Sequence, residues 1–272
     1  MDDLNQFLAR FAPGDVSSQQ FRNHPNQIQT FYTEGAITGA ATWWMNVFHP
    51  QALYFDVIVQ PEVSTALYEN MLVSVIEQAR IAGKPVLIFR EQSPGTPFGQ
   101  WLATAGFEVV RQTTMPLLTL GKIAPVSISA LSFNQLSDRQ KQQLLAASYQ
   151  HYQQTHLINP VRDFDTKVWA QVAFTDMIPE APIVLFDGVR IVAYCLVYAA
   201  DARAVEWGWM AGESLDSLLS LQHQQLAWLQ SRYQTVHGEF DSTDSMAAAT
   251  RKFWPFAASP VIRTYLKPLV AP

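Results

Sequence analysis

Apolar and polar residues follow the same order twice along this chain of 272 residues. In the first half, β-branched and aromatic residues flank Glu34-Gly35, which predicts two antiparallel strands joined by a turn. In the second half, Asp187-Gly188 stands between two apolar runs in the same way. The two glycines are offset by about 150 residues, a distance that indicates one domain copied once rather than a short structural repeat.

A long amphipathic helix follows the strands in each half. The first is expected to begin after Ser64, a favourable N-cap residue, and to stop at Gly83. The second covers residues 214–233, with leucines along one stripe. A further strand, a short helix and closing strands complete each half, the closing strands at residues 107–120 and 260–269.

This order predicts an α+β fold, an α/β sandwich in which each half is a mixed, mostly antiparallel sheet flanked by helices. Residues 121–129 contain glycine and proline, lack helical periodicity and link the halves. We therefore expect two domains, residues 1–122 and residues 123–272.

Composition narrows the choice of partners. The formal net charge of -5 and the pI near 5.6 disfavour a broad phosphate-binding surface, so we expect no nucleic-acid partner. No apolar run approaches the roughly 18 residues of a membrane span, and the N-terminus is unlike a signal peptide, so we expect a cytoplasmic protein. The one cysteine, Cys195, is interpreted as a buried core thiol.

The order of elements resembles the GNAT acyltransferase fold present twice, as in tandem GNAT proteins of the mycothiol synthase type. Residues 59–62, Val-Gln-Pro-Glu, resemble the end of the family's strand four, and Gly106-Phe107 resembles its usual Gly-Phe pair. The resemblance implies a bacterial N-acetyltransferase that uses acetyl-CoA. It also implies that the pantetheine arm lies where strands four and five part.

The same resemblance implies the residues that contact the cosubstrate. The family's glycine-rich turn is missing from both halves, because Thr65, Leu67 and Glu69 stand at its glycine positions in the first half and Gly212 is followed by Glu213 in the second. The N-terminal domain is therefore expected to be degenerate. An alternative is that both crossover helices are simply well capped and bind no CoA. The expected cosubstrate contacts are Trp209, Met210, Ala211, Gly212 and Ser214 in the second half, and Val59 and Ser64 in the first.

Acyl transfer to an amine needs a base for the ammonium and an acid for the departing thiolate. Glu206, in an apolar strand, is the expected base, although a carboxylate paired with an arginine would look the same in sequence. Asp56 is the weaker equivalent in the first half. Asp241 could orient a substrate amine or cap the following helix. The family's acid tyrosine is replaced by Leu102 and by Arg251.

Other residues suggest less specific roles. His151 and His156 have no neighbouring cysteine or carboxylate pattern of a metal site, so we expect no metal and interpret both as surface or loop histidines. The tryptophans on the strands are interpreted as core residues, with an aromatic-lined acceptor pocket as the alternative. They are Trp43, Trp44, Trp207 and Trp209.

The leading hypothesis is an acyltransferase that moves an acetyl or other acyl group from CoA to a primary amine of a small molecule or peptide, as a monomer or homodimer. Its active centre is expected in the second half, which holds Glu206 and Asp241. The alternative is a catalytically inactive protein that binds a metabolite or acyl-CoA. A third possibility, the aminoacyl-tRNA-dependent peptidoglycan transferases, is disfavoured because the acidic chain has no basic cluster for tRNA.

Overall fold

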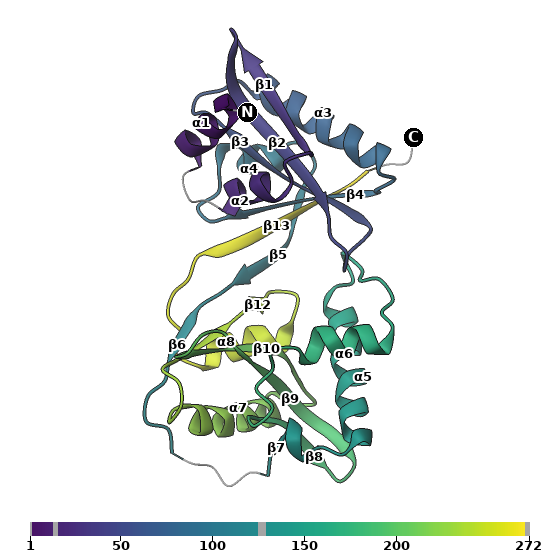
Figure 1. The fold of residues 1–272 in the computed structure, drawn as a ribbon, viewed down its shortest axis with the longest axis vertical. Coiled ribbons are helices and arrows are strands. Elements are labelled where there is room, and N and C mark those ends of the chain that lie inside the picture. The colour runs from purple at the N-terminus through teal and green to yellow at the C-terminus, as the bar shows by residue number, and fades with distance from the viewer. Residues whose placement is uncertain (1, 13–15, 125–128, 270–272) are drawn as a thin grey trace. The chain divides into compact units, whose positions relative to one another are not determined.

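A computed structural model describes residues 2–12, 16–124 and 129–269 of the chain. The chain divides into two compact units. Unit 1 comprises residues 1–110, 158–162 and 263–272, and unit 2 comprises residues 111–157 and 163–262. Each unit has a sheet flanked by helices (Figure 1), which confirms the predicted α+β class with mixed, mostly antiparallel sheets.

The sheet of unit 1 starts with the predicted hairpin. Glu34 and Gly35 are its two loop residues, with φ angles of 51° and 82°, as a tight turn between twisted strands requires. The third and fourth strands pair in parallel, and their connection is the crossover helix. The strands are β1 (Ile28–Thr33), β2 (Ala36–Met45), β3 (Ala52–Val59), β4 (Val86–Gln92), β13 (Val261–Pro268) and β5 (Glu108–Thr114), hydrogen-bonded in that order.

Helices cover both faces of this sheet (Figure 1). α1 (Asp2–Phe11) and α2 (Val16–Asn23) pack with Ala40 and Ile58, whereas α3 (Thr65–Ile81) and α4 (Pro97–Leu102) pack with Ala41 and Phe55 on the other face. The sequence analysis gave no helix at α2, whose residues are mostly polar. Its buried Phe21 supplies the apolar contact that the polar composition of this short helix concealed.

The sheet of unit 2 is also mixed. Among its described strand pairings, that of β10 with β11 alone is parallel, and it spans the long helix α7. The second hairpin differs slightly from the predicted one, because Asp187 ends β8 and the loop residues are Gly188 and Val189. The strands are β6 (Leu117–Thr119), β11 (Thr235–Gly238), β10 (Ala204–Gly212), β9 (Arg190–Ala199), β8 (Pro182–Asp187) and β7 (Leu131–Ser132), in that order.

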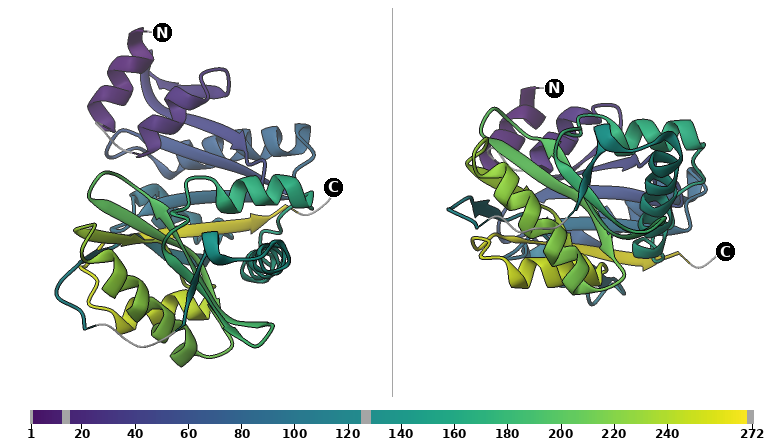
Figure 2. Two further views of the ribbon diagram at one scale, coloured as in Figure 1. Left: turned by 60° about the horizontal axis from the view of Figure 1, so that its bottom comes forward. Right: turned by 90° about the horizontal axis from the view of Figure 1, so that it is seen from below.

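Alternating side chains on β9 and β10 separate the two faces of this sheet. Cys195 and its cross-strand partner Met210 are buried on the face covered by α7 (Leu215–Leu229) and α8 (Ser245–Phe253). Tyr194 points to the other face, towards α5 (Asp138–Thr155), which is followed by α6 (Thr166–Phe174). Figure 2 shows α5 and α7 on opposite sides of these strands.

The two halves of the sequence exchange their closing strands. β13, at the end of the chain, lies between β4 and β5 in the sheet of unit 1, and β6, from the first half, lies beside β11 in unit 2. The short strand β12 (Phe240–Asp241) pairs with the end of β5 at Thr113 and Thr114. The predicted division into residues 1–122 and 123–272 describes the duplicated sequence and stays a prediction.

The described helices contain no stretch with the length and apolarity needed to cross a membrane. The expectations of a cytoplasmic location and of a monomer or homodimer stay predictions.

The ring of Tyr198 restricts position 208 of unit 2 to glycine. This ring lies over Gly208 so closely that a Cβ atom there would collide with it. Its hydroxyl donates a hydrogen bond of 2.7 Å to the carbonyl of Ala173 at the end of α6. Gly208 therefore allows a tyrosine to tie the strands to the helix layer.

We predict that Gly208→Ala destabilises the protein by about 1–3 kcal/mol, because the added methyl overpacks against the Tyr198 ring. Urea denaturation measures the change in the free energy of unfolding. Gly121→Ala is the control, since no atom lies within 4 Å of the position that its added methyl group would occupy. Equal stability of the two variants would show that the ring moves aside freely.

Candidate functional site

The parallel strands β10 and β11 separate part of the way along. They pair from Ala204 and Thr235 to Trp207 and Gly238, but β10 continues to Gly212. Beyond Trp207, this edge of β10 faces no strand in the part of the chain that the structure describes. Its backbone donors and acceptors are therefore available to another extended chain. We call this region the strand opening.

A β-bulge lies at the start of the strand opening. The register between β10 and β9 shifts between Trp207 and Met210, so that Gly208 and Trp209 together face Leu196. A bulge re-aims a side chain and leaves local backbone groups unpaired. The Trp209 ring packs 4.9 Å from Trp169 on α6.

The corresponding strands of unit 1 part as well, but without a bulge. Parallel pairing of β3 and β4 ends at Phe55 and Phe89, and β3 continues to Val59. The register of β2 with β3 runs unbroken from Met45 to Gly39. The two units thus share the parting of strands and differ in how the parted strand is shaped.

The crossover helices also start differently. Ser214 caps α7, its hydroxyl accepting a hydrogen bond of 3.2 Å from the Ser217 amide, and Asp216 lies in the first turn. Glu213 forms an ion pair with Arg190 at 3.0 Å, which offsets part of the negative charge there. Ser64 occupies the predicted N-cap of α3 but makes no capping side-chain hydrogen bond, and the first turn of α3 has no acidic residue.

A tight turn follows the strand opening on the β11 side. The Asp244 amide donates to the Asp241 carbonyl at 3.1 Å, closing residues 241–244 into a turn. Asp244 caps α8, because its Oδ1 accepts hydrogen bonds from the amides of Met246 and Ala247. Asp241 therefore does not cap this helix. Its carboxylate instead accepts from Arg111 at 3.2 Å and from the hydroxyl of Thr113.

Two histidines at the end of α5 meet this turn. His151 Nε2 lies 2.8 Å from Asp244 Oδ2, so the carboxylate holds a proton on that nitrogen and leaves Nδ1 as the basic one. His156 Nε2 lies 3.3 Å from Arg111 Nη1 and must accept from it, while its Nδ1 donates to the Tyr152 carbonyl at 2.8 Å. Both histidines are half-buried. His151 lies on α5, which corrects its interpretation as a surface or loop residue, whereas His156 stands in the turn that follows α5, a loop position.

Three buried polar atoms around this turn have no hydrogen-bond partner among the described residues: the Tyr194 hydroxyl, Arg111 Nε and Thr243 Oγ1. Tyr194 is only 3% exposed, and its ring meets His151 edge-on with centroids 6.4 Å apart. Burial, and then the charge of Asp244, raises the pKa of Tyr194, so its hydroxyl keeps its proton. Seven further buried polar atoms of the described residues also lack a partner, and these three are the ones that lie around the turn.

We call this set of residues, all in unit 2, the turn cluster. It consists of Arg111, His151, His156, Tyr194, Asp241, Thr243 and Asp244.

Glu206 lies on β10 in its paired part, one residue before pairing with β11 ends. Its cross-strand partners are His237 and Tyr198, and it is half-buried. Burial is the main cause that raises the pKa of Tyr198, with smaller contributions from Cys195 and from the charge of Glu206. The described residues give Glu206 no ion pair with an arginine, and its role as a base stays a prediction.

The structure places the expected cosubstrate contacts of unit 2 along the strand opening. Trp209 lies in the bulge, Met210 is buried, Ala211 and Gly212 end the unpaired edge of β10, and Ser214 caps α7. In unit 1, Val59 ends β3 and Ser64 precedes α3. Asp56 is 5% exposed on β3, and its Oδ1 accepts from the Val57 amide at 2.8 Å. The roles of these residues stay predictions.

The positions of the missing acid tyrosine hold residues with structural contacts. Leu102 is fully buried in the core of unit 1, and Arg251 donates to the Ala257 carbonyl at 3.1 Å. No group of three or more histidine, cysteine or acidic residues in the described ranges could hold a metal ion.

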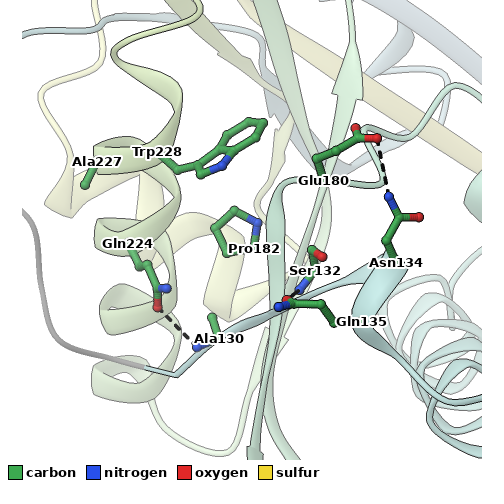
Figure 3. A pocket seen from close by; sticks show the side chains of 9 residues that line it. All are labelled: Ala130, Ser132, Asn134, Gln135, Glu180, Pro182, Gln224, Ala227 and Trp228. Carbon is green, nitrogen blue, oxygen red and sulfur yellow. Dashed lines mark hydrogen bonds between the residues drawn. The ribbon is translucent and has the colours of Figure 1, made fainter.

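A hollow of about 580 Å³ lies at the other edge of the unit 2 sheet, where β7 and β8 meet α7 (Figure 3). Its amide side chains are engaged by the protein itself: Gln224 accepts from the Ala130 amide at 3.2 Å, and Asn134 donates to Glu180 at 3.3 Å. β8 and β9 stand between β7 and β10 in the sheet order, so this hollow is separate from the strand opening.

No protein-family model matches the chain, and no curated protein matches it in sequence. Solved structures match it over nearly its full length. A GCN5-related N-acetyltransferase from Sphaerobacter thermophilus has a TM-score of 0.61 at 13% identity, covering 98% of this chain and 91% of its own. One from Anabaena variabilis has a TM-score of 0.51 at 11% identity, covering 98% and 70%.

These similarities show that the chain has the fold of the GCN5-related N-acetyltransferases, which confirms the resemblance derived from the sequence. A tandem GNAT protein from the clavulanic acid biosynthesis pathway also matches, with a TM-score of 0.47 at 12% identity, covering 98% of this chain and 88% of its own.

The sequence analysis missed most of the turn cluster. It noted His151 and His156 but tested them only as metal ligands, and it examined Asp241 without Asp244. The spacing of these two aspartates around Ser242 and Thr243 was the one available signal, since such a segment forms turns and caps helices. Tyr194 gave none, because its lack of a hydrogen-bond partner depends on tertiary contacts.

We predict that Tyr194→Phe leaves the free energy of unfolding unchanged or increases it, because the variant removes a buried hydroxyl that has no partner among the described residues. Tyr198→Phe should cost about 1 kcal/mol, because the Ala173 carbonyl loses its donor. Both tyrosines lie on β9, and urea denaturation compares them directly. A loss in Tyr194→Phe as large as in Tyr198→Phe would show that the Tyr194 hydroxyl is satisfied within the fold.

Proposed function

We propose that unit 2 transfers an acyl group from an acyl-CoA thioester, acetyl-CoA in the first instance, to an amine. The observation that carries this proposal is the strand opening, where β10 continues past the end of its pairing with β11 and starts with a bulge. A pantetheine arm is extended and contains amide groups, so it can pair with an unpaired strand edge as another strand would.

The fit of the pyrophosphate is less favourable than that of the arm. The start of α7 offers the first-turn amides that Ser214 does not occupy, and Arg190 adds a positive charge nearby. Glu213 and Asp216 oppose an anion there. Gly212 allows β10 to pass close to the start of α7, since a Cβ atom there would lie 2.8 Å from the Ser214 carbonyl oxygen.

The chemistry follows from the groups needed for amide formation. The amine nitrogen attacks the thioester carbonyl carbon, a C–N bond forms, and the C–S bond breaks. The ammonium loses two protons in total, of which one ends on the sulfur and one in solvent. Glu206, at the closed end of the strand opening, is proposed to accept the first through water, and Asp241, which holds Arg111, is proposed to help orient the amine substrate.

A second candidate is a protein that binds an acyl-CoA or a metabolite without turnover. The occupied start of α7 and the residues at the two tyrosine positions, Leu102 and Arg251, favour it. The two candidates share cosubstrate binding in the strand opening and differ in whether CoA is released.

We predict that Glu206→Gln lowers the rate of CoA release by about 10²–10⁴-fold, because the amide cannot accept the proton. Isothermal titration should give an unchanged affinity for acetyl-CoA. Glu180→Gln, beside the separate hollow, is the matched control and should retain full activity. Undiminished turnover in Glu206→Gln would exclude this carboxylate as the base, and no CoA release by the unaltered protein with any amine would favour the binding protein.

We predict that Ser214→Asp weakens acetyl-CoA binding by about tenfold, whereas Ser64→Asp leaves it unchanged. Aspartate is as good an N-cap as serine, so α7 keeps its cap, and α3 has no side-chain cap to lose, while a negative charge is added where a pyrophosphate would lie. Isothermal titration with acetyl-CoA measures both affinities. A loss confined to Ser64→Asp would place the cosubstrate in unit 1 instead.

A further inference from the structure

The turn cluster has an arrangement of charge and free donors that points to a particular kind of acceptor. Its two aspartates, Asp241 and Asp244, outnumber its one arginine, so the field in the cluster favours a cation. At the same time, three buried polar atoms in it lack partners among the described residues, and two of them belong to the donors Arg111 and Tyr194. A ligand that satisfies both features carries a positive group and an oxygen acceptor close together.

Arg111 offers a geometry suited to a carboxylate. Its side-chain hydrogen bonds to Asp241 and to His156 both use Nη1. Nη1 carries two hydrogens, so these bonds engage that nitrogen fully. The Nε–Nη2 edge of the guanidinium takes part in neither of these bonds, and Nε is buried without a partner among the described residues. Two parallel donors on one edge are the arrangement that binds a carboxylate in a bidentate fork.

The other end of the cluster suits an amine. His151 holds its proton towards Asp244 and presents Nδ1 as an acceptor, and the second oxygen of the Asp244 carboxylate is already used by the α8 amides. The Tyr194 hydroxyl beside them can accept a hydrogen from an ammonium or donate one to a neutral amine. An amine placed there would give this buried hydroxyl the partner that it lacks.

The turn of residues 241–244 joins the two ends. Asp241 holds Arg111 and Asp244 holds His151, and one backbone hydrogen bond of 3.1 Å fixes the two aspartates relative to each other. The site is built on ordered elements, since its other members come from α5, β5 and β9. Arg111 and His151 are therefore each held by an aspartate of the same turn.

Resting on the function proposed above, we propose that the acyl acceptor is an amino acid, bound in the turn cluster with its carboxylate on the Nε–Nη2 edge of Arg111 and its amine between Tyr194, His151 and Asp244. Neighbouring Trp209 and Tyr152, whose rings are 5.7 Å apart, offer aromatic surface to a side chain.

The test compares acceptors that differ only in the carboxylate. Thermal-shift measurements with the common L-amino acids at millimolar concentration, with and without acetyl-CoA, select a responsive one. That amino acid, its amide and its decarboxylated amine are then compared by rates of CoA release and by isothermal titration. The unaltered protein should prefer the amino acid by about ten- to a hundredfold.

Two variants test which residue binds the carboxylate of the ligand and which binds its amine. Arg111→Lys keeps a positive charge beside Asp241 but removes the fork, so it should abolish the preference for the carboxylate while the decarboxylated amine reacts as before. Tyr194→Phe should weaken the binding of the amino acid, of its amide and of the amine by similar factors. Arg232→Lys, just after α7, and Tyr198→Phe are the controls, and both should keep the carboxylate preference.

The outcomes separate this inference from the proposed function. Carboxylate-selective binding without CoA release would support the site and overturn acyl transfer. CoA release at equal rates with the amino acid, its amide and its amine would support acyl transfer and overturn the site. No thermal shift with any common L-amino acid, in the presence or absence of acetyl-CoA, would also overturn it, as would an unchanged preference in Arg111→Lys.

Discussion

The functional architecture of unit 2 depends on the point where β10 leaves β11. Parallel pairing satisfies the backbone of both strands up to Trp207 and Gly238, and beyond this point the β10 edge needs another partner. The bulge at Gly208 and Trp209 follows at once and turns Trp209 towards α6. Because Tyr198 covers Gly208, the bulge is fixed by packing against the helix layer as well as by hydrogen bonds.

The turn cluster lies near the other strand of this pair, where the chain leaves β11. After β11 ends, the chain forms β12 and the turn of residues 241–244 before α8 begins. Asp244 serves two purposes there, since one carboxylate oxygen caps α8 and the other holds His151. A buried hydroxyl and a buried guanidinium nitrogen without partners cost stability in the unliganded fold. Other buried atoms of the described residues, such as Trp207 Nε1 and Gln225 Oε1, lack partners as well, so it is the gathering of three such atoms at one turn that distinguishes this place.

Duplication has left two units with one plan and different details. Both part their parallel strands ahead of the crossover helix, but only the unit 2 strand carries the bulge. The crossover helices also differ, because Ser64 leaves the start of α3 without a side-chain cap while Ser214 caps α7. The bulged strand edge, which suits a pantetheine arm, is thus in unit 2, whereas the uncapped helix start, which suits a pyrophosphate, is in unit 1.

The sequence by itself determined the class of fold, the Glu34-Gly35 turn and the starts of the long helices after Ser64 and Ser214, because these follow from local periodicity and turn chemistry. Tertiary structure alone decided that β13 and β6 are exchanged between the two halves of the sequence, since strand pairing at long range leaves no local signal. It also decided which polar groups lack partners. Tyr194 and Tyr198 stand in one apolar run, yet one hydroxyl finds a carbonyl and the other has no partner among the described residues. That difference is set by neighbours distant in sequence, so only the folded chain reveals it.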